Sequence, residues 1–157
     1  MSAPARAYVA LGANLGDVRA TLAAACDALA SLPGTALVAT SSWWRTAPVE
    51  AVGPDFLNGV AALDTTMAPL QLLDALQEIE RRHGRTRPHR NAPRTLDLDL
   101  LLHGDAPLSS ARLTLPHPRL AERAFVLAPL LEVAPELRGR YAPALAALAH
   151  QRVERLP

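Results

Sequence analysis

The segment Thr95-Leu-Asp-Leu-Asp-Leu-Leu-Leu102 alternates polar and apolar residues, which is typical of a half-buried β-strand. Because successive side chains of a strand point to opposite faces, Asp97 and Asp99 share one face and the intervening leucines share the other. The two carboxylates then stand roughly 6 to 7 Å apart. Such a pair is costly to leave dry, and magnesium, which prefers one or two carboxylates with waters and substrate phosphates, would satisfy it. On the aspartates alone, a solvated face whose carboxylates meet only water or arginine is an equal alternative.

The residues before this strand predict further strands and helices, and together with the strand these elements define the fold. Strands are expected at residues 7–11, 36–44 and 56–63, and helices between Asp17 and Pro33 and between Pro69 and Gly84. The order strand, helix, strand, strand, helix, strand is the split βαβ pattern. We therefore expect an α+β fold: a ferredoxin-like antiparallel sheet with helices packed on one face. The proline- and leucine-rich remainder predicts a loop and further helices, a helical C-terminal extension of that core.

The composition limits the class of protein. The 157 residues are half hydrophobic, which is enough for one core, so residues 1–157 are expected to form a single domain. A formal net charge of +1 argues against bulk binding to nucleic acid or membranes. The chain has no apolar run of the roughly 18 residues that a membrane span needs, and its N-terminus lacks the apolar core of a signal peptide. Cys26 is the only cysteine, which excludes an internal disulfide and a cysteine zinc cluster. A cytoplasmic location is expected.

All sixteen basic residues are arginine, and their placement is uneven. The lack of lysine excludes a P-loop and a Schiff-base enzyme. Six arginines lie within the fourteen residues 81–94. Arginine forks match phosphate oxygens bidentately, so a proline-bounded loop there could close over a polyphosphate. Arg85, Arg87 and Arg94, in or beside that loop, are the functional candidates, whereas the two arginines at the preceding helix end suit a solvated face.

Other candidate residues carry a weaker signal. His117 lies between two prolines and has no second histidine or cysteine at ligand spacing, which argues against zinc and favours a role in phosphate contact or local hydrogen bonding. Phe56 and Phe125 stand beside polar residues in an aromatic-poor chain. Packing in the core is the default interpretation for both aromatic side chains.

Taken in order, these pieces resemble the family of 6-hydroxymethyl-7,8-dihydropterin pyrophosphokinases, which transfer diphosphate from ATP to a pterin alcohol and leave AMP, in folate biosynthesis. The resemblance covers nearly the whole chain. It rests on Ala7-Tyr-Val-Ala-Leu-Gly-Ala-Asn-Leu-Gly16, Arg45-Thr-Ala-Pro48, Asp55-Phe-Leu-Asn58, Pro93-Arg-Thr-Leu-Asp-Leu-Asp99 and Pro116-His117. The segment that ends at Asp99 is similar to the family signature and is the most specific of the five.

The resemblance implies roles for individual residues. Two magnesium ions, held by Asp97 and Asp99, would bridge the ATP phosphates, and Arg85 and Arg94 would complete the catalytic set. The pterin, sandwiched by two aromatic rings and hydrogen-bonded by an asparagine, would be bound by Thr46, Pro48, Val49, Phe56, Asn58 and Phe125. The ATP site would comprise Gln77, Glu80, Arg85, Arg87, Arg94, Leu100, Arg112, Thr114, His117 and Arg123. The partners are then small molecules, with neither nucleic acid nor membrane, and a monomer is expected.

Two other functions remain open from the sequence. One is a ferredoxin-like module that holds RNA with the arginine loop. RNA-recognition sheets, however, need exposed aromatic side chains on their central strands, where this sheet carries Asp97 and Asp99. A catalytically weak or inactive nucleotide-binding relative is suggested by Asn91-Ala92, where the family usually has tryptophan and glycine, and by Pro118, where tyrosine is common.

Overall fold

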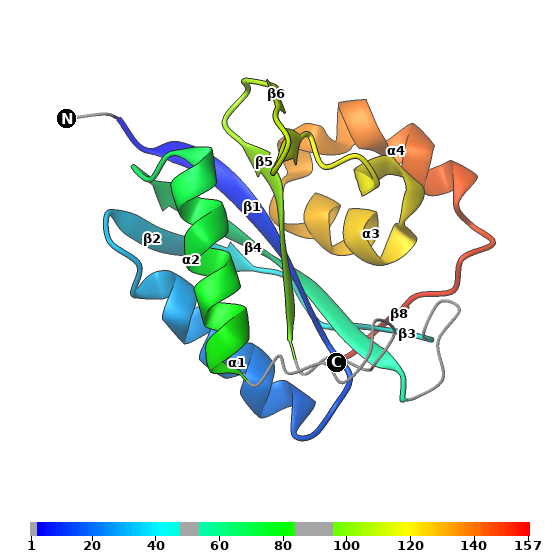
Figure 1. Ribbon diagram of the computed structural model, residues 1–157. Coiled ribbons are helices and arrows are strands. Elements are labelled where there is room, and N and C mark those ends of the chain that lie inside the picture. Colours follow the sequence, from blue (N-terminus) through cyan, green and yellow to red (C-terminus); the bar gives the residue numbers. More distant parts are fainter. Residues whose placement is uncertain (1–2, 48–53, 84–95) are drawn as a thin grey trace.

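One antiparallel sheet runs through the molecule (Figure 1). The computed structural model of the chain describes residues 3–47, 54–83 and 96–157. Within them, the sheet consists of β1 (Ala5–Ala13), β2 (Thr35–Thr40), β3 (Trp44–Thr46), β4 (Phe56–Thr65), β5 (Asp97–His103) and β8 (Glu154–Arg155). The strands β6 (Leu108–Ser109) and β7 (Thr114–Leu115) form a separate hairpin. The helices are α1 (Val18–Ala30), α2 (Pro69–Arg82), α3 (Ala124–Val133) and α4 (Arg138–Ala147), with the 3₁₀ turns η1 (Leu120–Glu122) and η2 (Pro135–Leu137).

The order of the strands confirms the split βαβ prediction. β1 lies between β5 and β4 and is antiparallel to both. On its other side, β4 pairs with β2 along one half and with β3 along the other. Each helix α1 and α2 thus connects two strands that have a third strand inserted between them, which is the ferredoxin-like α+β arrangement.

The sheet has a hydrophobic core on each face. Because side chains alternate along β1, its residues Ala7, Val9 and Leu11 face one core, whereas Tyr8 faces the other. The first core is closed by apolar side chains of α1 and α2, and the second by those of α3 and α4. Figure 1 shows the two pairs of helices on opposite sides of the sheet. The expectation of helices on one face therefore holds for α1 and α2 only.

The predicted helix starts are confirmed by their caps. Asp17 Oδ1 accepts a hydrogen bond from the backbone N–H of Ala20 at 3.2 Å, which satisfies a donor of the first turn of α1. Pro69 occupies the first position of α2, where its missing N–H costs nothing. Gly84, the predicted stop of α2, lies outside the described residues. None of the helices described has both the length and the apolar character needed to cross a membrane.

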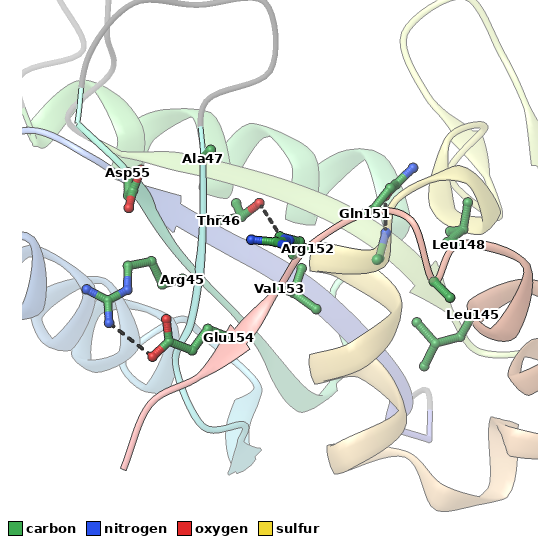
Figure 2. Close-up of a pocket in the computed structure, with 12 residues that line it drawn as sticks. Arg45, Thr46, Ala47, Asp55, Leu145, Leu148, Gln151, Arg152, Val153 and Glu154 are labelled. Atoms are coloured by element: carbon green, nitrogen blue, oxygen red, sulfur yellow. Dashed lines mark hydrogen bonds and ion pairs between the residues drawn. The ribbon is translucent and has the colours of Figure 1, made fainter.

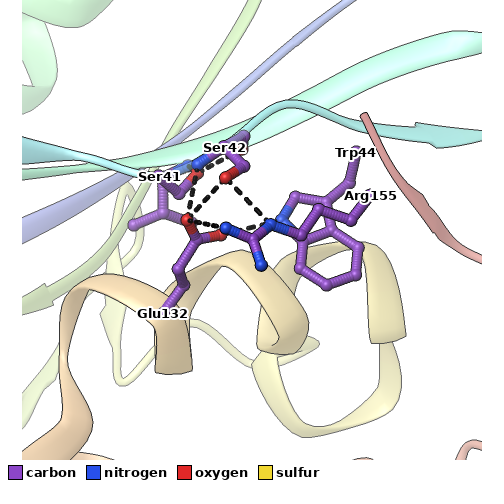
Figure 3. Close-up of polar contacts among 6 residues, drawn as sticks. Ser41, Ser42, Trp44, Glu132 and Arg155 are labelled. Carbon is purple, nitrogen blue, oxygen red and sulfur yellow. Dashed lines mark hydrogen bonds and ion pairs between the residues drawn. The ribbon is translucent and has the colours of Figure 1, made fainter. Parts of the chain in front are cut away.

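The prediction of one continuous strand at residues 36–44 is wrong. β2 ends at Thr40 and β3 starts at Trp44. The backbone N–H of Val60, which a continuous strand would pair, donates instead to Ser41 Oγ at 2.9 Å. The next residue turns to α3, where Glu132 accepts hydrogen bonds from the backbone N–H and hydroxyl of Ser42 at 2.9 and 2.7 Å (Figure 3). The side chains of Ser41 and Ser42 therefore break the ladder.

Candidate active site

The aspartate pair lies on the face of β5 that the sequence predicts. Leu98 and Leu100 are buried in the core beneath α1 and α2. Asp97 is half-buried and Asp99 is exposed on the opposite face. Leu101, farther along the strand, is buried in the second core. The helices α3 and α4 thus cover Leu101 on this face but leave the carboxylate of Asp99 accessible.

His117 and Arg123 belong to the surroundings of Asp99. The backbone N–H of His117 donates to the carbonyl oxygen of Leu101 at 3.0 Å, which holds the residue beside β5. Burial lowers the pKa of His117, the negative charge of Asp99 raises it, and the positive charges of Arg123 and Arg119 lower it, so that the net shift is downward. Asp99, Arg123 and Arg119 therefore all influence the charge of the imidazole.

Asn58 supplies a buried polar group on the same face of the sheet. Its position on β4 is opposite Gly12 of β1, and Gly12 is in turn opposite Asp97 of β5. Two strand spacings, about 9 to 10 Å, thus separate Asn58 from Asp97. The side chain of Asn58 is buried, with 6% of the residue exposed, and Nδ2 has no hydrogen-bond partner among the described residues. Because an unpaired buried donor costs about 1 to 3 kcal/mol, this amide is suited to a ligand that accepts a hydrogen bond.

Aromatic side chains reach this region from two elements. Phe56 begins β4, two residues before Asn58, and is half-buried. Phe125 lies in the first turn of α3, packs against the second core and is also half-buried. The guanidinium carbon of Arg123 lies 5.7 Å from the centre of the Phe125 ring. Core packing therefore accounts for only part of each ring.

Thr46 lies at the edge of the same region. It pairs with Phe56 across β3 and β4. Its hydroxyl donates to the carbonyl oxygen of Arg152 at 3.3 Å. A groove of about 900 Å³ runs between β3 and the segment from Leu145 to Glu154 (Figure 2). Thr46 therefore joins the C-terminal segment to the strand that carries Asn58.

The residues expected on the nucleotide side lie along α2, β5 and the β6–β7 hairpin. Gln77 and Thr114 are exposed. Arg112 forms an ion pair with Asp74 of α2 at 2.5 Å, which links the hairpin to that helix. Glu80 is buried, and its Oε2 accepts a hydrogen bond from the backbone N–H of Leu98 at 2.9 Å. Glu80 thus ties α2 to the aspartate strand.

Leu100 differs from the other expected nucleotide contacts. Its side chain is 2% exposed within the first core, on the face opposite the aspartates. Leu100 can therefore contact a ligand on the aspartate face only through its backbone atoms.

Several predicted residues lie outside the described part of the chain: Pro48, Val49, Arg85, Arg87 and Arg94, as well as Asn91. Among residues 3–47, 54–83 and 96–157, no three His, Cys, Asp or Glu side chains gather as a metal site. The aspartate pair nevertheless fits magnesium, which takes one or two carboxylates and fills its other positions with waters and phosphate oxygens.

Gly12 and Asn14 belong to the motif at residues 7–16, but the sequence predicts no individual role for either residue. Asn14 is buried, its Nδ2 donates to the carbonyl oxygen of Pro54 at 3.2 Å, and its Oδ1 has no partner in the described region. A glycine within a strand signals a close approach of other groups, but the strand expected at residues 7–11 ends before Gly12, whereas β1 extends to Ala13.

Known proteins resemble this chain over most of its length. The family model described as 7,8-dihydro-6-hydroxymethylpterin-pyrophosphokinase (HPPK) matches residues 8–135. The chain belongs to this family. It is 53% identical over 157 residues to the 2-amino-4-hydroxy-6-hydroxymethyldihydropteridine pyrophosphokinase of Pseudomonas aeruginosa, with 97% of each chain covered. It is 46% identical over 132 residues to the Haemophilus influenzae protein of that name, with 83% of this chain and 82% of that one covered.

Solved structures show the same HPPK fold. The Plasmodium falciparum HPPK-DHPS A437G structure with SDX-DHP superposes with a TM-score of 0.74 over 96% of this chain. At 14% identity this similarity concerns the fold alone, and this chain spans 46% of that longer chain.

Proposed function

We propose that the chain transfers diphosphate from ATP to 6-hydroxymethyl-7,8-dihydropterin, giving AMP and 7,8-dihydropterin-6-ylmethyl diphosphate in folate biosynthesis. The observation that carries the proposal is the shared face of Asn58 and Asp97, which lie on the two strands that flank β1. A buried amide with an unpaired donor suits the polar edge of a heterocycle, and an aspartate pair suits a magnesium polyphosphate. The names of the similar Pseudomonas and Haemophilus proteins state the same activity.

The pterin would lie among Asn58, Phe56 and Phe125. The two half-buried rings come from β4 and α3, so they can contact a flat heterocycle from different elements. Offset stacking of aromatic rings contributes about 0.5 to 1.5 kcal/mol beyond the burial of their area. Asn58 would fix the orientation of the heterocycle in its plane by donating from Nδ2. Thr46, the last residue of β3, and Pro48 and Val49, which follow it in the sequence, would complete the pterin site.

The polyphosphate would lie across Asp97 and Asp99. These carboxylates would hold two Mg²⁺ ions, which when bound supply charge neutralisation for the phosphates. His117 Nδ1 accepts a hydrogen bond from the backbone N–H of Arg119 at 3.1 Å, so a neutral imidazole carries its proton on Nε2. Nε2–H can therefore donate to a phosphate oxygen, and Arg123 adds a fixed positive charge beside it.

The remaining proposed ATP contacts are Gln77, Glu80, Leu100, Arg112 and Thr114. They come from three neighbouring elements that the Glu80 and Arg112 contacts join to one another. Arg85, Arg87 and Arg94 would add the bidentate phosphate contacts that arginine forks make.

The reaction would be an in-line displacement at the β-phosphorus of ATP. The bond from the pterin hydroxymethyl oxygen to the β-phosphorus forms, and the bond from that phosphorus to the oxygen bridging to the α-phosphorus breaks. AMP leaves with the electron pair, and the hydroxyl proton passes to water. Positioning and electrostatic stabilisation supply most of the catalysis in such transfers, so this chain needs no strong general base.

The identity of the nucleotide product tests the proposal. With ATP, magnesium and 6-hydroxymethyl-7,8-dihydropterin, AMP should accumulate in a one-to-one ratio with the pterin consumed, measured by chromatography. A reaction without pterin serves as the control and should form no AMP. Stoichiometric ADP would identify an ordinary kinase, and ATP binding without any turnover would identify an inactive nucleotide-binding relative.

A further inference from the structure

Gly12 occupies the centre of the candidate site. It lies on β1 between Asn58 of β4 and Asp97 of β5, and all three residues are on one face because they are direct cross-strand partners. The next row on this face is Val60, Ala10 and Asp99. The middle strand therefore carries only glycine and alanine where the flanking strands carry the amide and the carboxylates.

The glycine is required by space and not by backbone conformation. The glycines with positive φ in the described residues are Gly16, Gly34 and Gly104, so the backbone at Gly12 is one that an alanine adopts without strain. A Cβ atom at Gly12 would lie 3.0 Å from Asn58 Oδ1, 3.8 Å from the carbonyl oxygen of Leu57 and 3.9 Å from Phe56 Cδ1. The contact at 3.0 Å is closer than a carbon and an oxygen normally approach.

The side chain that would have to move is that of Asn58, because its Oδ1 is the atom nearest to the added Cβ. Asn58 Nδ2 has no partner in the described structure, so the amide can rotate away from a methyl group without breaking a contact there. The atoms nearest to the added Cβ all belong to residues 56–58. A methyl group at Gly12 would thus press on the pterin side of the site.

We propose that Gly12 is a positioning residue for pterin recognition: its lack of a side chain allows the Asn58 amide to lie against β1, with Nδ2 directed to the ring. This inference rests on the proposed function. It assigns to Gly12 no contact with the phosphates and no part in the chemical step. Its effect on the substrate is exerted through Asn58 alone.

A double-mutant cycle tests the inference. We expect Gly12→Ala to weaken binding of 6-hydroxymethyl-7,8-dihydropterin about tenfold and to raise its KM, while the affinity for a non-hydrolysable ATP analogue stays within about twofold and kcat changes little. Asn58→Ala should weaken pterin binding as well. Because Gly12 acts through Asn58, adding Gly12→Ala to Asn58→Ala should cause almost no further loss. Pterin and ATP analogue are titrated separately by calorimetry.

Controls separate this result from a folding defect. Gly139→Ala is the matched change, since a Cβ at Gly139 meets nothing within 4 Å, and it should leave both affinities at the wild-type values. Equal losses of pterin and ATP binding, a Gly12→Ala chain that does not fold, or an undiminished effect of Gly12→Ala in the Asn58→Ala background would each overturn the inference. A wild-type chain that does not bind the pterin would refute the proposed function itself.

Discussion

At Asp97 and Asp99, two negative charges stand on a face whose neighbouring positions on β1 are Gly12 and Ala10. The side chain of Asp99 is exposed, so the packing of the sheet does not depend on it. A carboxylate at such a position is suited to binding a cation such as magnesium. The nearby His117 supplies a neutral imidazole near neutral pH, because the downward shift of its pKa from 6.5 disfavours the protonated form.

Replacing either aspartate should remove activity and spare the fold. We expect Asp97→Asn and Asp99→Asn each to lower kcat by a factor of about 10² or more, the size of effect seen when one preorganised electrostatic contact is lost. The thermal unfolding midpoint should stay within a few degrees of wild type for Asp99→Asn, which is exposed. Asp105→Asn, at an exposed turn after β5, is the control and should retain activity. Near-normal kcat with an unchanged need for magnesium would contradict the assignment.

Single residues differ in how far their roles could be predicted from the sequence. The shared face of Asp97 and Asp99 follows from the period of two, a local property of one strand. The surroundings of Asn58 cannot be predicted in this way. The burial of its side chain and its unpaired donor depend on the register between β4 and β1 and on Gly12 of the neighbouring strand. Only the resemblance to a family singled out Asn58, and nothing singled out Gly12.

At the scale of elements, Glu132 joins three segments that are distant in the sequence. It accepts hydrogen bonds from Ser42 and from Trp44 Nε1, at 3.1 Å for the indole, and forms an ion pair with Arg155 of β8 at 3.8 Å (Figure 3). Burial raises the pKa of Glu132, but the hydrogen bonds from Ser42 and Trp44 and the charge of Arg155 outweigh burial and lower it. Glu132 thus holds α3, which carries Phe125, against β3, which carries Thr46.

Removing the Glu132 charge should destabilise the protein in a pH-dependent way. We expect Glu132→Gln to lower the free energy of unfolding by about 1 to 3 kcal/mol at pH 7. A lowered pKa in the folded state stabilises the protein above the ordinary value of 4.5, and this stabilisation is lost as the pH falls through the folded-state pKa. The difference between wild type and variant should therefore shrink below about pH 4.5, as measured by urea denaturation at several pH values.

The matched control for this prediction is Glu154→Gln. Glu154 forms an exposed ion pair with Arg45, with 66% of the Glu154 side chain accessible, so its loss should change stability by no more than about 0.5 kcal/mol. Equal effects of the two substitutions would show that Glu132 acts as an ordinary surface charge.

The same contacts explain why the sequence predicts one strand at residues 36–44 where the structure has two. Val38, Thr40 and the two tryptophans favour a strand. The break at Ser41 depends on Val60 and on Glu132, which lie far along the chain. No local pattern contains that information. The helix starts at Asp17 and Pro69 were predictable because their caps involve residues within three positions.

At the scale of the whole molecule, one sheet lies between two cores, and its strands contribute to both. Along β4, Ala61 and Leu63 face the first core, whereas Val60 and Ala62 face the second. If one core unfolded, the strands that it shares with the other core would be lost, and the apolar side chains of that other core would be exposed to water. We therefore propose that the chain unfolds as one cooperative unit, in accord with the expected single domain.

Truncating one leucine in each core tests this cooperativity. Leu76 of α2 and Leu127 of α3 are each 0% exposed, on opposite sides of the sheet. We expect Leu76→Ala and Leu127→Ala each to lower the free energy of unfolding by about 2 to 5 kcal/mol, since each removes buried contacts and leaves a cavity. Because Trp43 packs against the first core and Trp44 bonds to Glu132 of α3, tryptophan fluorescence reports from both sides of the sheet. Fluorescence and far-ultraviolet circular dichroism should therefore give one coincident urea transition in wild type and in both variants. Two separate transitions, or a variant in which fluorescence changes before the circular dichroism, would show that the two cores unfold independently and would contradict a single cooperative unit.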